Sequence, residues 1–347
     1  MSINFIEASI EKLVVHKVGN KVADENFVIS KKEVILDKET TLLLSHYFLS
    51  QFKSAELYRF YHDTELSYNE TYSYTSKIFT DPSLLIEQSS NIARHLYNQS
   101  THPKIKGGEF YLVYFKNCVL DGEILDGIGL FKSENKDTFL EVEPIIDGFE
   151  IESRKGININ KLDKGVLIFN TQKETGFILS IIDNTNRNIE AQYWKDDFLG
   201  VEPVKNEFHQ TNQFLGITKQ FVTKQMTEDF EVTKAEQIDL LNRSVEYFKT
   251  NDKFEKNEFE KTVFQNKELI ESFQGFDNSY RNTNDIILSD NFDISSQAVK
   301  KQIRAFKKVL KLDKNFHIYI HGDKDLIEQG IEKDGRKFYK IYYKDES

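Results

Sequence analysis

Hydrophobic and polar residues alternate at the start of the chain in a pattern that predicts two short strands. Residues 10–21 (IEKLVVHKVGNK) and 26–36 (NFVISKKEVIL) have this pattern, and a Gly-Asn turn separates them. Over 37–63 the spacing of the apolar residues changes to that of a helix, with Leu57 and Phe60 on its apolar side. We therefore expect two strands followed by a helix.

A second helix is predicted after a polar, tyrosine-rich passage, SYNETYSYTSK (67–77). Asp81-Pro82 is a capping residue followed by a proline, the usual start of a helix, and the apolar period continues to about Asn98. The first hundred residues are thus predicted to have the order ββαα.

From residue 107 to 183 the chain consists of short runs rich in β-forming residues, separated by turn signals. Asp121-Gly122 and Asp147-Gly148 are compatible with tight hairpins, so a mostly antiparallel sheet is expected. Residues 206–226 then have a helical pattern, in which three residues should be packed in a core: Phe214, Phe221 and Met226.

A domain boundary is expected between residues 228 and 229. The sequence predicts an acidic α+β domain over 1–228, with N-terminal helices and the antiparallel sheet, and a smaller C-terminal α+β domain over 229–347. In the second domain the predicted helices cover 233–250, 256–264, 266–275 and 296–312. Short strands close the chain, and Asp334-Gly335 predicts a final hairpin. The predicted fold class is α+β.

Composition indicates a folded protein with an aromatic core, since 28 Phe and 16 Tyr occur among 347 residues. No apolar run approaches the roughly 18 residues of a membrane helix, and the first 21 residues lack the continuous apolar segment of a signal peptide. We expect a cytoplasmic protein without membrane contact. The single cysteine, Cys118, cannot form an internal disulfide, which agrees with a reducing compartment.

The chain lacks the short motifs of several enzyme classes. No phosphate-binding GxxxxGK[ST] loop, GxGxxG, HExxH, GxSxG or paired CxxC is present. The sequence therefore gives no reason to propose catalytic residues, a cofactor or an enzymatic activity.

Three weaker signals favour structural roles. His317 and His321 share a strand face but are about 13 Å apart, too far to bind one metal ion. Cys118 lies among apolar residues and is interpreted as a buried small side chain. The segment from Asp183 to Asn188 has too few acids for a calcium loop and is interpreted as a turn. No metal site is predicted.

The most unusual segment is KKQIRAFKKVLKLDK (300–314), which has seven basic side chains and one acid in a chain with a formal net charge of −10. On a helical projection, Val299, Ile303, Phe306 and Leu310 form an apolar stripe, and a continuous basic stripe lies on the other side. The segment's basic residues are the candidate DNA-binding residues: Lys300, Lys301, Arg304, Lys307, Lys308, Lys311 and Lys314.

Two interpretations of this basic stripe remain open. Residues 1–233 contain 25 Lys and Arg against 35 Asp and Glu, whereas 234–347 contain 21 of each, so the stripe lies where acid does not dominate. It can contact an external polyanion, or it can pair with the acidic N-terminal domain. Lys104 and Lys106 are a secondary candidate extension of the basic surface.

Four segments together resemble the bacterial nucleoid-associated protein family of the NdpA/YejK type. They occur in the family's order at 107–117 (GGEFYLVYFKN), 156–169 (GININKLDKGVLIF), 197–215 (DFLGVEPVKNEFHQTNQFL) and 306–343. The resemblance implies a nucleoid-located protein that associates with DNA and has no known enzymatic activity. It supplies no residue roles.

The leading hypothesis is a nucleoid-associated protein that binds double-stranded DNA with weak sequence specificity, because lysines on one helix face suit phosphate contact. The alternative is a non-enzymatic interaction scaffold, including a homodimer, that reaches the nucleoid through other nucleoid proteins. The acidic majority of the chain, whose potential opposes DNA, motivates this alternative.

Overall fold

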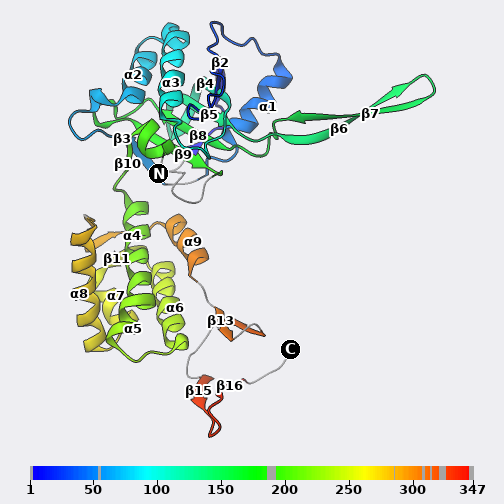
Figure 1. The fold of residues 1–347 in the computed structure, drawn as a ribbon. Helices are drawn as coiled ribbons and strands as arrows, with labels where there is room; N and C mark the ends of the chain where they lie inside the picture. The colour runs from blue at the N-terminus through cyan, green and yellow to red at the C-terminus, as the bar shows by residue number, and fades with distance from the viewer. Residues whose placement is uncertain are drawn as a thin grey trace. The chain divides into compact units, whose positions relative to one another are not determined.

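The chain folds into two compact units, Met1–Val204 and Lys205–Ser347 (Figure 1). The computed structural model describes residues 3–53, 56–185, 193–284, 286–306, 309–312, 315–319 and 326–343. The division at Val204 and Lys205 precedes the expected boundary at 228 and 229. The physical reason is that Phe214 and Phe221 are fully buried in the core of the second unit.

The first unit is built on an antiparallel sheet of eight strands. Seven strands follow the order β1-β4-β5-β8-β9-β3-β10, and the eighth, β2, also pairs with β4. The strands are β1 (Ile3–Asn4), β2 (Ser9–Val18), β3 (Leu57–Phe60), β4 (Gly108–Leu120), β5 (Glu123–Ser133), β8 (Lys164–Phe169), β9 (Ile178–Asp183) and β10 (Val201–Pro203).

Both faces of this sheet are buried. On one face Phe110 and Leu112 of β4 pack with residues of α2 (Glu70–Thr80), α3 (Leu85–Gln99) and the π-helix η5 (Tyr193–Leu199). On the other face, Tyr111 and Val113 pack with residues of α1 (Lys38–Leu49). Successive side chains of a strand point to opposite faces, so one strand contributes to both cores.

The predicted order ββαα is wrong in three places within the first hundred residues. The second strand, expected over 26–36, is not formed; in this segment only Val28 makes an isolated bridge, to Lys17 of β2. The helix expected over 37–63 ends at Leu49, and Leu57 and Phe60 lie in β3, because this strand pairs with β9 and β10 and is largely buried. The tyrosine-rich passage forms α2, whose inner side includes two buried threonines, Thr71 and Thr75. These polar side chains disguise the helical period.

The region 107–183 confirms the predicted antiparallel strands and both hairpins. Asp121 and Gly122 join β4 to β5, and both have positive φ, 50° and 84°, as the tightest hairpin turn requires. The second hairpin joins β6 (Asp137–Ile145) to β7 (Gly148–Gly156), but its turn is Ile146-Asp147, one residue before the expected Asp147-Gly148, because Gly148 pairs with Ile145. This pair, called the ribbon below, extends away from the sheet as a separate two-stranded arm (Figure 1).

The second unit is a helical body with a core made largely of phenylalanine. Helix α4 (Glu207–Gln220) is followed by a π-helical turn, η6 (Phe221–Gln225), and Phe214, Phe221 and Met226 are fully buried as predicted. A two-stranded pair, β11 (Lys253–Glu255) with β12 (Asn291–Asp293), borders this core. The helices are α4 (Glu207–Gln220), α5 (Met226–Asp229), α6 (Lys234–Thr250), α7 (Lys256–Val263), α8 (Lys267–Thr283) and α9 (Ser296–Ala305).

Two short hairpins follow α9. One joins β13 (Val309–Leu312) to β14 (Phe316–Tyr319), and the other joins β15 (Ile327–Ile331) to β16 (Lys337–Ile341). The second confirms the predicted turn at Asp334-Gly335, where Gly335 has a φ of 85°. Together with the sheet of the first unit, these elements confirm the predicted α+β class.

Candidate functional site

Helix α9 begins the candidate basic surface and is fixed to the second core along one side. Ser295 caps the helix, its side chain accepting from the backbone N–H of Ala298. Ala298 and Val299 are buried, and Ile303 packs against the aromatic core. Gln302 donates to the side-chain oxygen of Asn212 at 2.7 Å. The inner side of α9 therefore has the apolar character that the helical projection predicts.

The prediction of one continuous helix over 296–312 is wrong. Helix α9 ends at Ala305, and Phe306, which is buried, has extended backbone angles. Residues 309–312 form β13, where Leu310 pairs with Ile318. Leu312 packs with Ala235 and Ile238 of α6, and this contact is made from a strand. The projection is therefore valid only as far as Ala305.

The predicted DNA-binding residues are consequently divided between a helix and a strand. Lys300 and Lys301 are exposed on α9, which also includes Arg304, and Lys311 lies in β13 opposite His317. The side chains of Arg304 and Lys311 are outside the described part of the structure. Three further candidates lie wholly outside the described residues: Lys307, Lys308 and Lys314.

The exposed start of this surface has a local positive potential. Helix α9 contains no acidic residue, and within the described residues Lys300 forms no ion pair. The Nζ atom of Lys301 lies 5.5 Å from the ring centroid of Phe208, a cation–π distance that holds the lysine near the helix surface. The second unit has 24 Lys and Arg against 25 Asp and Glu, whereas the first has 22 against 31.

Lys104 and Lys106, the secondary candidates, lie in the first unit and line a pocket of about 310 Å³. Lys106 donates to the side-chain oxygen of Asn135 at 2.7 Å. Glu134 and Asp163 line the same pocket. The mixture of signs weakens any attraction of this pocket for a polyanion.

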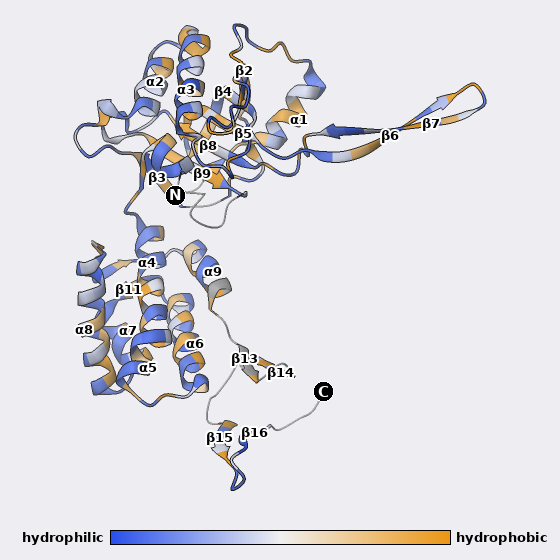
Figure 2. Cartoon of the chain, in the orientation of Figure 1, coloured by the Kyte–Doolittle hydropathy of each residue, from blue (hydrophilic) through white to orange (hydrophobic). Residues whose placement is uncertain are grey.

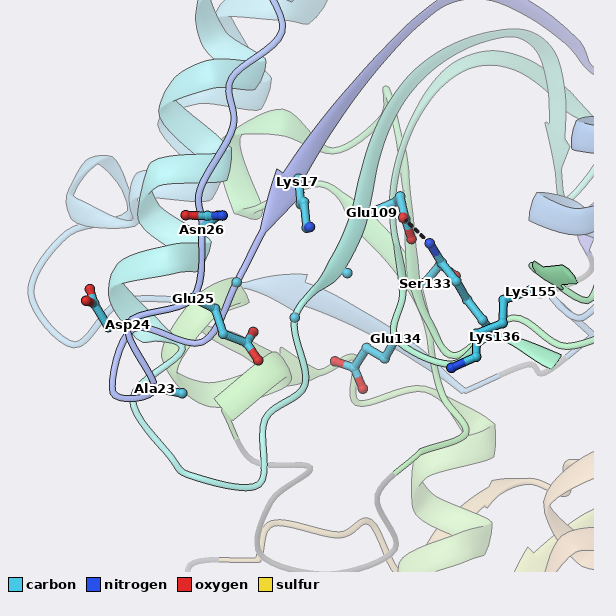
Figure 3. A pocket seen from close by; sticks show the side chains of 13 residues that line it. Lys17, Ala23, Asp24, Glu25, Asn26, Glu109, Ser133, Glu134, Lys136 and Lys155 are labelled. Carbon is cyan, nitrogen blue, oxygen red and sulfur yellow. Dashed lines mark hydrogen bonds and ion pairs between the residues drawn. The ribbon is translucent and has the colours of Figure 1, made fainter. Parts of the chain in front are cut away.

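A larger cleft of about 650 Å³ lies beside β4 and β5 (Figure 3). Glu109 on its wall pairs with Lys136 at 2.6 Å. The cleft has no histidine among its described lining residues, and acids and bases are mixed along it. Its charged residues are Lys17, Asp24, Glu25, Glu109, Glu134, Lys136 and Lys155.

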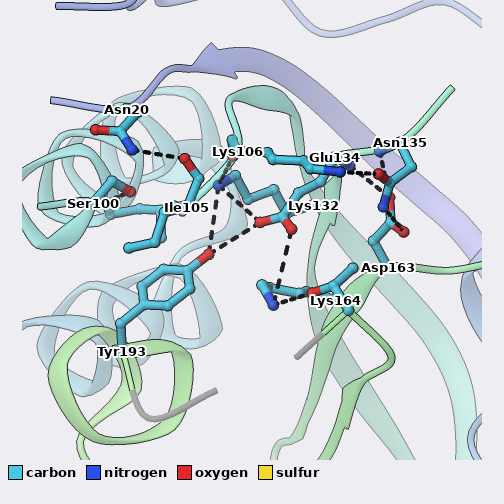
Figure 4. Close-up of polar contacts among 12 residues, drawn as sticks. Asn20, Ser100, Ile105, Lys106, Lys132, Glu134, Asn135, Asp163, Lys164 and Tyr193 are labelled. Atoms are coloured by element: carbon cyan, nitrogen blue, oxygen red, sulfur yellow. Dashed lines mark hydrogen bonds and ion pairs between the residues drawn. The ribbon is translucent and has the colours of Figure 1, made fainter. Parts of the chain in front are cut away.

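Behind the cleft, two buried lysines are held in an ion network (Figure 4). Lys132 Nζ lies 3.1 Å from Glu134 Oε1 and donates to the backbone oxygen of Lys106 at 2.7 Å. Lys164 Nζ lies 2.8 Å from Asp183 Oδ1 and 4.0 Å from Glu134 Oε2. Glu134 therefore lies between two ammonium groups whose side chains are 0% exposed.

Tyr193 completes the network from η5. Its hydroxyl donates to Glu134 Oε1 at 3.1 Å, and the two lysine Nζ atoms are 5.8 and 5.5 Å from its ring centroid. Burial lowers the pKa of Lys132, an effect that the Glu134 carboxylate opposes, and burial raises the pKa of the Tyr193 hydroxyl. Each ammonium has a carboxylate partner, and the network joins residues of β5, β8, β9 and η5.

Sequence reasoning missed this network, although one signal was available. Lys132 continues the alternation of Ile128 and Leu130 on a buried sheet face, and Lys164 likewise precedes Val166 and Ile168. A lysine at an inward position of a strand requires a buried partner. The partners lie far away in the sequence, so the pattern shows that they are needed but does not identify them.

No group of three or more His, Cys, Asp or Glu side chains suited to a metal ion occurs among the described residues. His317 is exposed on β14, and His321 lies outside those residues. Asp183 ends β9 and pairs with Lys164, and most of the segment after it also lies outside them.

Cys118 is 0% exposed, which confirms its interpretation as a buried side chain, and burial raises the pKa of its thiol to about 12. We expect the native protein to resist modification by a thiol reagent at neutral pH, because the thiolate is the reactive form. Absorbance assays with and without denaturant check this: the thiol should react only after unfolding. Rapid reaction of the native protein would contradict the burial of Cys118.

Comparison with known proteins places these features in a family. A family model described as nucleoid-associated protein YejK matches residues 14–341. No curated protein matches the chain. In the described part of the chain, every helix is too short or too polar to cross a membrane.

Proposed function

Because the chain belongs to the nucleoid-associated protein YejK family, we propose that it binds duplex DNA directly. The proposed contact is made by the basic segment 300–314 of the second unit, to backbone phosphates and without a catalytic step. The observation that carries this proposal is the exposure of Lys300 and Lys301 on a helix that contains no acid.

The attachment of α9 supports this role. Val299 and Ile303 fix its inner side to the core, and Gln302 bonds to Asn212 of α4. Lysines on a fixed helix can follow a phosphate backbone with less loss of chain entropy than lysines on a free tail. The segment then continues into β13, which includes Lys311.

Binding of this kind should be weakly specific and sensitive to salt. Phosphate contacts position a protein on DNA but carry little sequence information. If about five basic side chains neutralise phosphates, the logarithm of the binding constant should fall with the logarithm of salt concentration at a slope of roughly −4 to −5.

The test reverses four charges in the segment: Lys300→Glu, Arg304→Glu, Lys307→Glu and Lys311→Glu. We expect duplex affinity at low salt to fall at least tenfold, on the order of 1.4 kcal/mol or more, because attraction to phosphates becomes repulsion. The salt slope should become correspondingly shallow. Fluorescence anisotropy with a labelled duplex, titrated at several salt concentrations, measures both quantities.

A matched control reverses four lysines elsewhere on the second unit, giving the same change in net charge. Lys249, Lys253, Lys261 and Lys267 are all exposed and lie outside the basic segment. Each variant's circular dichroism and melting temperature establish that it is folded. If both variants lost the same affinity for DNA, binding would depend on the overall charge of the protein. If the variant of the basic segment lost no affinity, that segment would not be the DNA contact.

A second candidate function is a protein-interaction scaffold that reaches the nucleoid through partners, as a cytoplasmic protein without DNA contact of its own. The observation that favours it is the excess of acid in the first unit, 31 acidic against 22 basic residues. Purified protein that is not retained on DNA, yet retains nucleoid proteins from a lysate, would support this function over direct binding.

A further inference from the structure

The ribbon extends away from the sheet and contains both hydrophobic and hydrophilic residues (Figures 1 and 2). Its strand register separates these residues into two chemically different faces. Val142 pairs with Ile151 and Pro144 with Phe149, and paired residues share a face, so these residues and Leu140 form one apolar face. The alternate positions form a mainly acidic face, with Glu141 opposite Glu152 and Glu143 opposite Glu150 at its middle, and Phe139 and Ile145 near its two ends.

The apolar side chains remain accessible to solvent. Leu140 is 68% exposed, Val142 55%, Phe149 72% and Ile151 64%. A two-stranded hairpin without a covering layer is marginally stable in water, and an exposed apolar patch of this kind marks an interaction site. The ribbon therefore has the properties of a docking surface.

The acidic face excludes nucleic acid and anionic lipid as the partner. Four glutamates lie on it, and the described residues supply only one arginine there, Arg154, which is paired with Glu141 and Glu152. Phosphates approaching the ribbon would meet this negative field. The partner is therefore a protein surface with apolar side chains.

We propose that the apolar face of the ribbon packs against the same face of a second copy of this chain. The arrangement of charge along the face supports a two-fold contact centred on the pair Val142–Ile151. Lys155 lies in β7 at the base of the ribbon, four residues from Ile151, whereas Asp147 lies in the turn at the tip, next to Gly148. At about 3.3 Å per residue, Lys155 is roughly 13 Å from the centre and Gly148 roughly 10 Å from it on the other side.

A two-fold axis through that centre places the base of one ribbon over the tip of the other. Each Lys155 then faces the partner copy's Asp147, and the contact repeats on both sides of the axis, as an isologous interface requires. The glutamates of both acidic faces point outward and remain hydrated. The two ribbons stack as two small sheets, about 10 Å apart.

The proposed contact is small. Five exposed apolar side chains from each copy cover less area than the roughly 1,200–2,000 Å² of a stable interface. We therefore expect a reversible dimer with a Kd of about micromolar or weaker. Association should depend on protein concentration, and analytical ultracentrifugation of the full chain over a wide concentration range measures it.

The first test uses cross-linking at single cysteines, since Cys118 is buried. Val142→Cys lies at the proposed axis, so mild oxidation should join two copies through a disulfide. Glu143→Cys is its matched control, one residue along but on the acidic face. Equal cross-linking of both variants, or none with Val142→Cys, would overturn the proposal. If the Val142→Cys thiol were protected from thiol reagents at every protein dilution, another part of the same chain would be covering the ribbon. That result would also overturn the proposal.

The second test exchanges charges. Asp147→Lys and Lys155→Asp should each weaken self-association at least tenfold, because like charges then face one another. Mixing the two variants should restore it, since every facing pair in the mixed dimer is again of opposite sign. Failure of the mixture to associate better than either variant alone would contradict the two-fold arrangement.

A third variant separates the apolar contact from general charge effects. Val142→Glu should abolish association, whereas Ile35→Glu, at an apolar residue that is 98% exposed outside the ribbon, should leave it unchanged. Dimers that persist in Val142→Glu would show that another surface joins the copies, and a wild-type chain that stays monomeric throughout would refute self-association.

Discussion

We expect replacement of Glu134 by glutamine to lower the free energy of unfolding of the first unit by about 3–5 kcal/mol. The Glu134 carboxylate is 4% exposed and lies between the ammonium groups of Lys132 and Lys164. The substitution preserves side-chain size but removes the charge, so Lys132 loses its carboxylate partner in the interior. An uncompensated buried charge is far more costly than the loss of a surface ion pair.

Trp194 provides the measurement, because it is the only tryptophan in the chain and is fully buried in the first unit. Its fluorescence during urea unfolding follows that unit alone, which avoids treating a two-unit chain as one transition. Glu109→Gln is the matched control: Glu109 pairs with Lys136 in a partly exposed position, and its loss should cost less than about 1 kcal/mol.

A double variant tests whether charge balance is the cause. In Glu134→Gln with Lys132→Met, one charge of each sign is removed, so part of the lost stability should return. The losses of unfolding free energy in the two single variants could instead simply add in the double variant, or Glu134→Gln could cost no more than Glu109→Gln. Either result would show that the charges of the network contribute little to stability.

The second large effect concerns pH. His16 is buried in β2, and its pKa is lowered from 6.5 to about 4, first by burial and then by the positive charge of Arg94. The ring is held in its neutral form because Nδ1 accepts the backbone N–H of Ser30 at 3.1 Å, leaving Nε2 to donate to the Ser89 hydroxyl at 3.0 Å. Protonation of Nδ1 would break the first of these bonds.

The sign of the pH dependence follows from these two pKa values. The unfolded chain takes up a proton near pH 6.5 and the folded chain near pH 4, so the stabilisation is complete above pH 6.5 and is lost as the pH falls to 4. The total is about 3 kcal/mol, on the order of 1.4 kcal/mol per pH unit.

Urea unfolding of wild type and His16→Gln, followed by Trp194 fluorescence from pH 7.5 to 4.5, isolates this contribution from that of the carboxylates. The difference between the two proteins should narrow as the pH falls, because the variant lacks the titrating ring. His62→Gln, at an exposed histidine, is the matched control. Parallel stability curves for wild type and His16→Gln would refute the linkage.

Local signals in the sequence predicted local structure well. Asp121-Gly122 and Asp334-Gly335 specify turns through their own backbone preferences, so both hairpins were predictable. The strand Leu57–Phe60 was not predictable in this way, because it is defined by pairing with β9 and β10, which lie more than a hundred residues away in the sequence. A four-residue apolar run fits a helix and a strand equally well until its partners are known.

In the candidate site, too, local features could be predicted from the sequence, whereas features that depend on distant residues could not. The exposure of Lys300 and Lys301 follows from helical periodicity, which holds within α9. The end of the helix at Ala305 does not follow from helical periodicity. It depends on the pairing of β13 with β14 and on the packing of Leu312 against α6. The partners of Lys132 and Lys164 were equally inaccessible, since ion pairing across a fold leaves no periodic signal.

The division of the chain at Val204 and Lys205 has a genetic consequence. Each unit is continuous in sequence and has its own core, so the polypeptide passes between them only once. A recombination event at that point would transfer the basic segment with its supporting helices intact and leave the ribbon with its sheet.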